Sequence, residues 1–183
     1  MDKNRPLIKN GWLVDTLAIP SPNKNPRPDP SDIHLIIIHN ISLPPNQFGG
    51  SYVDEFFCNQ LKKEDHPYFE EIHQLKVSPH LFIKRNGDIT QFVPFHERAW
   101  HAGISNYKGQ ENCNDYSIGI ELEGADHIPY TPEQYQQLTQ CCEALIEYYP
   151  LLNTDNITGH SDISPGRKTD PGESFDWGFI EEI

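Results

Sequence analysis

The segment "HLIIIH", His34–His39, decides the fold because four consecutive aliphatic residues stand between two histidines. A continuous run rich in β-branched residues, without alternation, is typical of a strand that is buried on both faces of a sheet. The loop "NISLPPNQFGGS" follows directly, so His39 lies at the carboxyl end of this strand. Sites in α/β proteins usually lie at that end. The segment therefore predicts a central strand and the place of a functional site.

Other segments carry the period of a helix or a strand, and together they predict one domain over residues 1–183. Asn86-Gly87 between two alternating runs indicates a β-hairpin, and Thr131 with Gln134 three residues later indicates a capped helix start. The mixture predicts an α/β fold with a central mixed β-sheet flanked by helices. The further elements are a helix with apolar positions at Val53, Phe56, Phe57 and Leu61, a strand at "SIGIELEG" (Ser117–Gly124), a helix from Thr131 to Pro150, a short strand at "NITGH" and a terminal helix in "SFDWGFIEEI".

Composition excludes several classes of partner. The formal net charge of the 183 residues is -13, which disfavours binding to nucleic acid or to an anionic membrane surface, because both need a basic face. The longest apolar run is too short to span a bilayer. The N-terminus carries no signal-peptide pattern, so we expect a cytoplasmic protein whose four cysteines are free thiols. Oligomeric state does not follow from the sequence.

Three polar residues form a candidate metal site. His39 ends an aliphatic run, where an unpaired imidazole is costly. His160 ends a predicted strand, and Asp170 lies in the rigid loop "KTDPG". Two imidazoles and a carboxylate suit catalytic zinc with one open position. The alternatives are a hydrogen-bonded buried imidazole for His39 and an Asp-Pro turn for Asp170. Six other histidines are not candidates for this site. We interpret His34, at the start of a strand, and His80, inside a strand, as buried and hydrogen-bonded. We interpret the others as surface residues: His66, His73, His96 and His127.

Two further residues are candidates for the chemistry. Glu121 falls on the polar face of an alternating strand, where it can accept a proton from a metal-bound water. Lys168, two residues before Asp170, can place a positive charge against a developing oxyanion. The alternative for Lys168 is a solvated loop cation.

Long blocks of the sequence resemble a known family. "IIIHNISLPPNQFGG", "FVPFHERAWHAG", "CNDYSIGIELEG", "TPEQYQQL" and "TGHSDISPGRKTDPGESFDW" closely resemble the cytosolic 1,6-anhydro-N-acetylmuramoyl-L-alanine amidases of Gram-negative bacteria (AmpD type), whose wider family includes peptidoglycan recognition proteins. The resemblance implies a zinc amidase that cuts the lactyl–L-alanine amide of 1,6-anhydromuropeptides in peptidoglycan recycling, and so limits the muropeptides that induce β-lactamase. It implies zinc ligation by His39, His160 and Asp170, and Glu121 with Lys168 as the catalytic pair.

Residues that contact the muropeptide are a further expectation. Asn40 lies beside the first ligand, and Trp100 of "AWHAG" offers an aromatic face to the sugar, although this motif can also be structural packing. The family carries arginines in the loop that reads "YKGQENCND" here, where only Lys108 is cationic. Lys76 and Lys108 are our candidates for the peptide carboxylates, with Arg85 and Arg167 as possible compensation. The rival functions are a peptidoglycan-binding module without zinc and an amidase that acts on intact wall.

Overall fold

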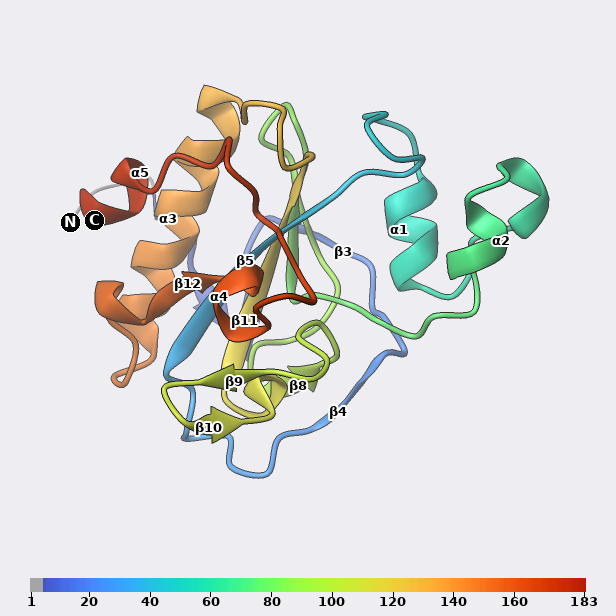
Figure 1. Cartoon of the computed structure of the whole chain (residues 1–183). Coiled ribbons are helices and arrows are strands. Elements are labelled where there is room, and N and C mark those ends of the chain that lie inside the picture. The colour runs from blue at the N-terminus through green and yellow to red at the C-terminus, as the bar shows by residue number, and fades with distance from the viewer. Residues whose placement is uncertain (1–4) are drawn as a thin grey trace.

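A six-stranded sheet forms the centre of the computed structural model, which describes residues 5–183 (Figure 1). The first four strands of the sheet are parallel to one another, the fifth runs antiparallel to the fourth, and the sixth is parallel to the fifth. The predicted mixed sheet is confirmed. In spatial order the strands are β12 (Ile157–Gly159), β5 (Leu35–Ile41), β11 (Ser117–Glu123), β6 (Leu81–Ile83), β7 (Ile89–Gln91) and β3 (Leu17–Ala18).

The remaining elements surround this sheet. Helix α3 covers one face together with α5, and α1 and α2 lie on the opposite side (Figure 1). The helices are α1 (Tyr52–Phe57), α2 (Phe69–Ile72), α3 (Pro132–Tyr148), α4 (His160–Ile163), α5 (Gly178–Glu181) and the 3-10 turns η1 (Lys63–Asp65), η2 (Cys113–Asp115) and η3 (Thr154–Asn156). Small antiparallel pairs are β1 (Ile8–Lys9) with β2 (Trp12–Leu13), β4 (Lys24–Pro26) with β8 (Glu97–Ala99), and β9 (Asn106–Tyr107) with β10 (Gln110–Glu111).

Strand β5 is buried on both faces, as its aliphatic run predicts. Ile36 and Ile38 belong to the apolar cluster that includes α3. Leu35 and Ile37 pack on the other face with a cluster that includes Ile163 of α4. The strand therefore lies between two apolar layers, and only its carboxyl end leaves the core.

Strand β11 corrects one expectation. Its alternation predicts a polar face, but all seven residues from Ser117 to Glu123 are buried. Because β11 is a central strand between β5 and β6, with packed layers on both sides, its second face is also largely covered. The alternation sorts the side chains correctly between the two faces, and it leaves Glu121 and Glu123 as buried carboxylates.

Most local predictions are confirmed. Asn86-Gly87 joins β6 and β7 in an antiparallel hairpin, and Thr131 and Gln134 form the complete capping box of α3. All four cysteines are free thiols. His80 lies just before β6 and not inside a strand. Within residues 5–183, none of the helices has both the length and the apolar character needed to cross a membrane.

Candidate metal centre

His39 and Glu121 reach the same face of the sheet because their strands are in register. β5 and β11 pair in parallel with His39 opposite Glu121, and opposed residues of adjacent strands point to the same side. His39 is 1% exposed and Glu121 is 9% exposed. The strand ladder thus places an imidazole and a carboxylate next to each other at the carboxyl end of the sheet.

His160 and Asp170 join this pair from the C-terminal part of the chain. β12 pairs with β5, with Gly159 opposite Ile38, so His160 begins α4 close to the end of β5. The backbone oxygen of Asp170 accepts a hydrogen bond from the Ser161 backbone N–H at 3.0 Å, which holds the loop against α4. These contacts carry both residues to His39 across more than 120 positions of sequence.

The donor atoms of the three residues form a nearly equilateral triangle. His39 Nδ1 lies 2.9 Å from His160 Nδ1 and 3.1 Å from Asp170 Oδ2, and His160 Nδ1 lies 3.0 Å from Asp170 Oδ2. The three residues therefore offer one ligand atom each to a common point. The predicted grouping of His39, His160 and Asp170 is what the structure shows.

Protonation suits these atoms to a metal ion. His160 Nε2 is 2.9 Å from the Ala102 carbonyl oxygen. Because a carbonyl only accepts, this nitrogen carries a proton, and the neutral form of the ring then has its lone pair on Nδ1. Burial lowers the pKa of His39 to about 4, so its imidazole is neutral. Burial also raises the pKa of Asp170, but the adjacent His160 and His39 outweigh that effect and hold it below its usual range. Three lone pairs thus converge, an arrangement that a divalent cation stabilises.

Glu121 stands beside this triangle as a strongly perturbed carboxyl group. Burial raises its pKa well above the usual range, the negative charge of Asp170 raises it further, and Lys168 opposes the shift. Among the described residues, none hydrogen-bonds to its Oε2 atom. A buried carboxyl with an unpartnered oxygen next to a candidate metal centre has the character of a proton acceptor.

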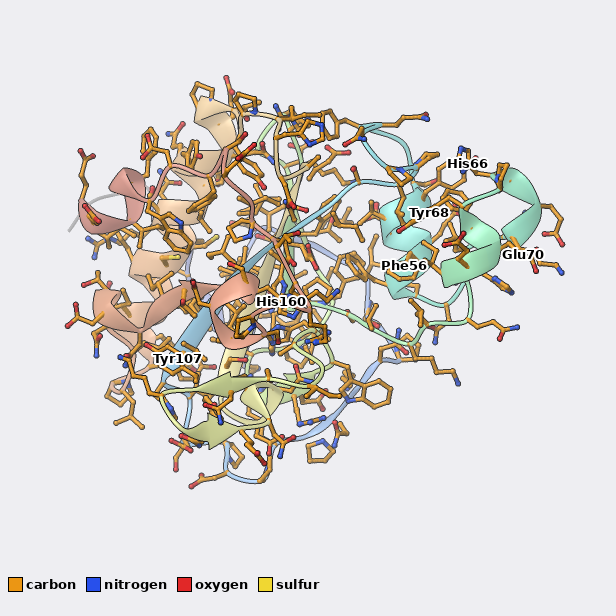
Figure 2. All side chains as sticks on the ribbon, viewed as in Figure 1. Phe56, His66, Tyr68, Glu70, Tyr107 and His160 are labelled. Carbon is orange, nitrogen blue, oxygen red and sulfur yellow. The ribbon has the colours of Figure 1, made fainter. Side chains whose placement is uncertain are left out.

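A cavity of about 600 Å³ opens over these groups. Arg167 and Lys168 bring positive charge to its wall. Figure 2 labels three of the lining side chains: His160 near the middle of the molecule, and Phe56 and Tyr68 in the region of α1 and α2. Asn40 also lines the cavity, and its amide nitrogen donates to Asp126 Oδ1 at 2.8 Å and to the Pro171 carbonyl oxygen at 3.1 Å.

Three predicted substrate-binding residues lie outside the cavity lining. The Trp100 indole donates to Asn25 Oδ1 at 2.6 Å, which agrees with the alternative that "AWHAG" packs structurally. The Lys108 ammonium lies over the Tyr107 ring, 3.3 Å from Asn156 Oδ1. Lys76 is exposed between two residues that do line the cavity. None of the three side chains is part of the cavity lining, and their contact with the muropeptide stays a prediction.

His101 is the site residue that the sequence did not reveal. Its Nδ1 lies 2.9 Å from His39 Nε2, and the residue is 9% exposed and lines the cavity. The contact joins residues 62 positions apart, and no spacing rule indicates it. By contrast His80 is the hydrogen-bonded buried imidazole that was expected: its Nδ1 accepts from the Gly119 backbone N–H at 3.1 Å, and its Nε2 lies 3.0 Å from the Glu97 carbonyl oxygen.

An α/β domain with a His-His-Asp cluster at the carboxyl end of its central strands defines a candidate metal-dependent enzyme. A family model described as N-acetylmuramoyl-L-alanine amidase matches residues 29–173. The chain belongs to this family.

Individual relatives cover nearly the whole chain. A Haemophilus influenzae protein named 1,6-anhydro-N-acetylmuramyl-L-alanine amidase AmpD is 54% identical over 170 residues, 93% of this chain and 92% of that protein. A crystal structure of a selenomethionine AmpD derivative superimposes with a TM-score of 0.93 at 51% identity, covering 96% of this chain and 98% of the other. The E. coli amidase AmiD, solved with the substrate anhydro-N-acetylmuramic acid-L-Ala-D-γ-Glu-L-Lys, gives a TM-score of 0.60 at 29% identity, covering 97% of this chain and 65% of AmiD.

Proposed function

We propose that residues 1–183 form a single catalytic domain, a zinc-dependent N-acetylmuramoyl-L-alanine amidase. It hydrolyses the amide between the lactyl group and L-alanine of 1,6-anhydromuropeptides in cytosolic peptidoglycan recycling, and so limits the muropeptides that induce β-lactamase. The observation that carries the proposal is the triangle of His39, His160 and Asp170 beside Glu121. The identity of 54% to the H. influenzae amidase supports the substrate class.

Zinc is the metal that fits this donor set best. Zn–N and Zn–O bonds of about 2.0–2.1 Å in tetrahedral geometry place neighbouring ligand atoms about 3.3 Å apart, close to the spacings of 2.9 to 3.1 Å seen here. Two imidazoles and one carboxylate leave the fourth position free, the pattern of catalytic sites. When bound, zinc supplies Lewis acidity to the carbonyl and lowers the pKa of water to about 7.

Two side chains then carry out proton transfer and charge stabilisation in amide hydrolysis. Glu121 takes the proton of the attacking water, a role that its raised pKa suits, and delivers it to the alanine nitrogen as the C–N bond breaks. The Lys168 ammonium stabilises the oxyanion that forms on the carbonyl oxygen. Burial of His39 and Glu121 strengthens these interactions by excluding bulk water.

Asn40 orients the muropeptide in this proposal. Its amide nitrogen is occupied by Asp126 and Pro171, so its amide oxygen is the group left to accept an N–H of the substrate. Arg167 and Lys168 are the cations of the cavity wall. With Lys168 assigned to the oxyanion, Arg167 is the cation placed to meet a peptide carboxylate, and Lys76 and Lys108 lie outside the lining.

Purification with metal analysis and a pair of substrates tests the proposal. We expect about one zinc per chain and rapid hydrolysis of soluble anhydromuramoyl tripeptide, with little release from intact peptidoglycan. Preferential turnover of intact wall would favour the alternative of a wall-lytic amidase, and tight peptidoglycan binding without zinc would favour a binding module. The expected partner is the small muropeptide substrate, and neither nucleic acid nor a membrane.

A further inference from the structure

One short segment, His101–Ala102, contacts both histidines of the candidate metal centre. His101 Nδ1 lies 2.9 Å from His39 Nε2, and the Ala102 carbonyl oxygen accepts from His160 Nε2 at 2.9 Å. In both rings Nε2 makes the contact with this segment, and Nδ1 faces the triangle. The segment is thus placed to control the orientation and the protonation of both rings.

The segment is itself held firmly. The backbone N–H groups of His101 and Ala102 both donate to Asn114 Oδ1, at 3.0 and 2.8 Å, and Asn114 is 7% exposed. At its far side the His101 ring places Nε2 3.2 Å from Ser117 Oγ. Both nitrogens of the His101 imidazole therefore have a partner.

Strand β11 leaves room for this ring. Gly119 lies two residues after Ser117 on the same face of the sheet, opposite Ile37. A Cβ atom at position 119 would lie 2.4 to 2.7 Å from three atoms of the His101 ring, closer than real Cβ contacts allow. The ring packs directly against the strand backbone, so any side chain at position 119 would displace it.

We propose that His101 is a positioning residue for the metal, whose Nδ1 accepts the proton on His39 Nε2 and keeps His39 Nδ1 free for the ion. The inference rests on the proposed function. A proton on His39 Nδ1 would occupy the place of the ion, so the metal-binding form requires His39 to donate through Nε2. His101 then carries its own proton on Nε2, which faces the Ser117 hydroxyl, and a hydroxyl oxygen accepts. Such outer partners of histidine ligands contribute about 10- to 100-fold in metal affinity.

Two amide variants separate this role from simple packing. The oxygen of His101→Asn lies near the place of Nδ1 and can still accept from His39, whereas the amide of His101→Gln lies near the place of Nε2 and cannot. We expect His101→Gln to weaken zinc binding about 10- to 100-fold and His101→Asn to retain most of the affinity. Competition with a chromophoric chelator measures both values on the full chain.

Control measurements distinguish the possible failures. His34→Gln alters a histidine that stacks on Tyr116 and should leave zinc affinity unchanged. Nitrogen-15 NMR of the zinc-loaded wild type should show a proton on His39 Nε2 and none on His101 Nδ1; a proton on His101 Nδ1 would overturn the inference even if a variant fails to fold. Equal zinc affinities of the Asn and Gln variants, whether reduced or not, would also overturn it. A wild-type protein that binds no zinc would instead refute the proposed function.

Discussion

His39 and Glu121 stand directly opposite each other on two adjacent parallel strands, β5 and β11. This register places the candidate base beside the first candidate ligand through backbone hydrogen bonds alone. A shift of one residue would move Glu121 to the α3 side of the sheet, because side chains alternate between faces. The core packing of β11 on both faces resists that shift.

Replacement of Glu121 should abolish the reaction and spare metal binding. We expect Glu121→Gln to lose about 10²- to 10⁴-fold in kcat, as for other positioned proton-transfer groups, while its zinc content stays at the wild-type value. Glu147→Gln, an exposed change on α3, is the matched control. Wild-type kcat in Glu121→Gln would show that another group moves the proton.

The same substitution should stabilise the zinc-free protein. Burial raises the pKa of Glu121 in the folded state above its unfolded value, so the folded protein binds this proton more tightly. Stability is therefore lost as pH rises from the unfolded pKa through the folded pKa. We expect Glu121→Gln to have the higher Tm at pH 7.5, with a difference that shrinks as the pH falls toward 4. A Tm difference that is independent of pH would contradict this account.

Removal of the metal should cost both activity and stability. A ligand at a thousand times its Kd stabilises the folded state by about 4 kcal/mol, so chelation should lower the Tm clearly and added zinc should restore it. Mg²⁺ should not replace zinc, since it prefers oxygen ligands. His160→Ala serves as the comparison, because its Tm should not respond to zinc. An unchanged Tm and rate after complete chelation would rule out a metal enzyme.

Loss of Lys168 should slow the chemical step, whereas loss of Lys76 or Lys108 should not. We expect Lys168→Ala to reduce kcat by about 10²-fold, as for loss of one group that stabilises an oxyanion, with a small change in KM. Lys76→Ala and Lys108→Ala remove the same charge outside the cavity and should keep kcat/KM near the wild-type value. Comparable losses in all three variants would indicate a general electrostatic effect on substrate binding.

The sequence predicts those features that depend on local pattern. The aliphatic run before His39 identifies the central strand, and Thr131 with Gln134 identifies the start of α3. The burial of Glu121 does not follow from the alternation of β11, because alternation separates two faces without saying what covers them. That information lies in the packing of segments distant in sequence.

The candidate site also contains residues that the sequence indicates and one that only the folded structure shows. Each of His39, His160 and Asp170 can be selected from its own surroundings, and the resemblance to amidases joins them. The role of His101 depends on a contact with His39 and on the missing side chain of Gly119. The aromatic ring of Trp100 predicts a contact with the sugar, but its indole N–H donates to Asn25 Oδ1. Residue type alone does not tell which way a side chain turns.

The candidate ligands come from β5 and from a stretch that begins 121 residues later. An ion held between them would fasten the carboxyl-terminal stretch to the middle of the molecule, much as a covalent cross-link closes a long loop and restricts the unfolded chain. Zinc scarcity would then loosen residues 160–183 before the rest, and would expose them to proteases. Metal supply would set the lifetime of the protein as well as its rate.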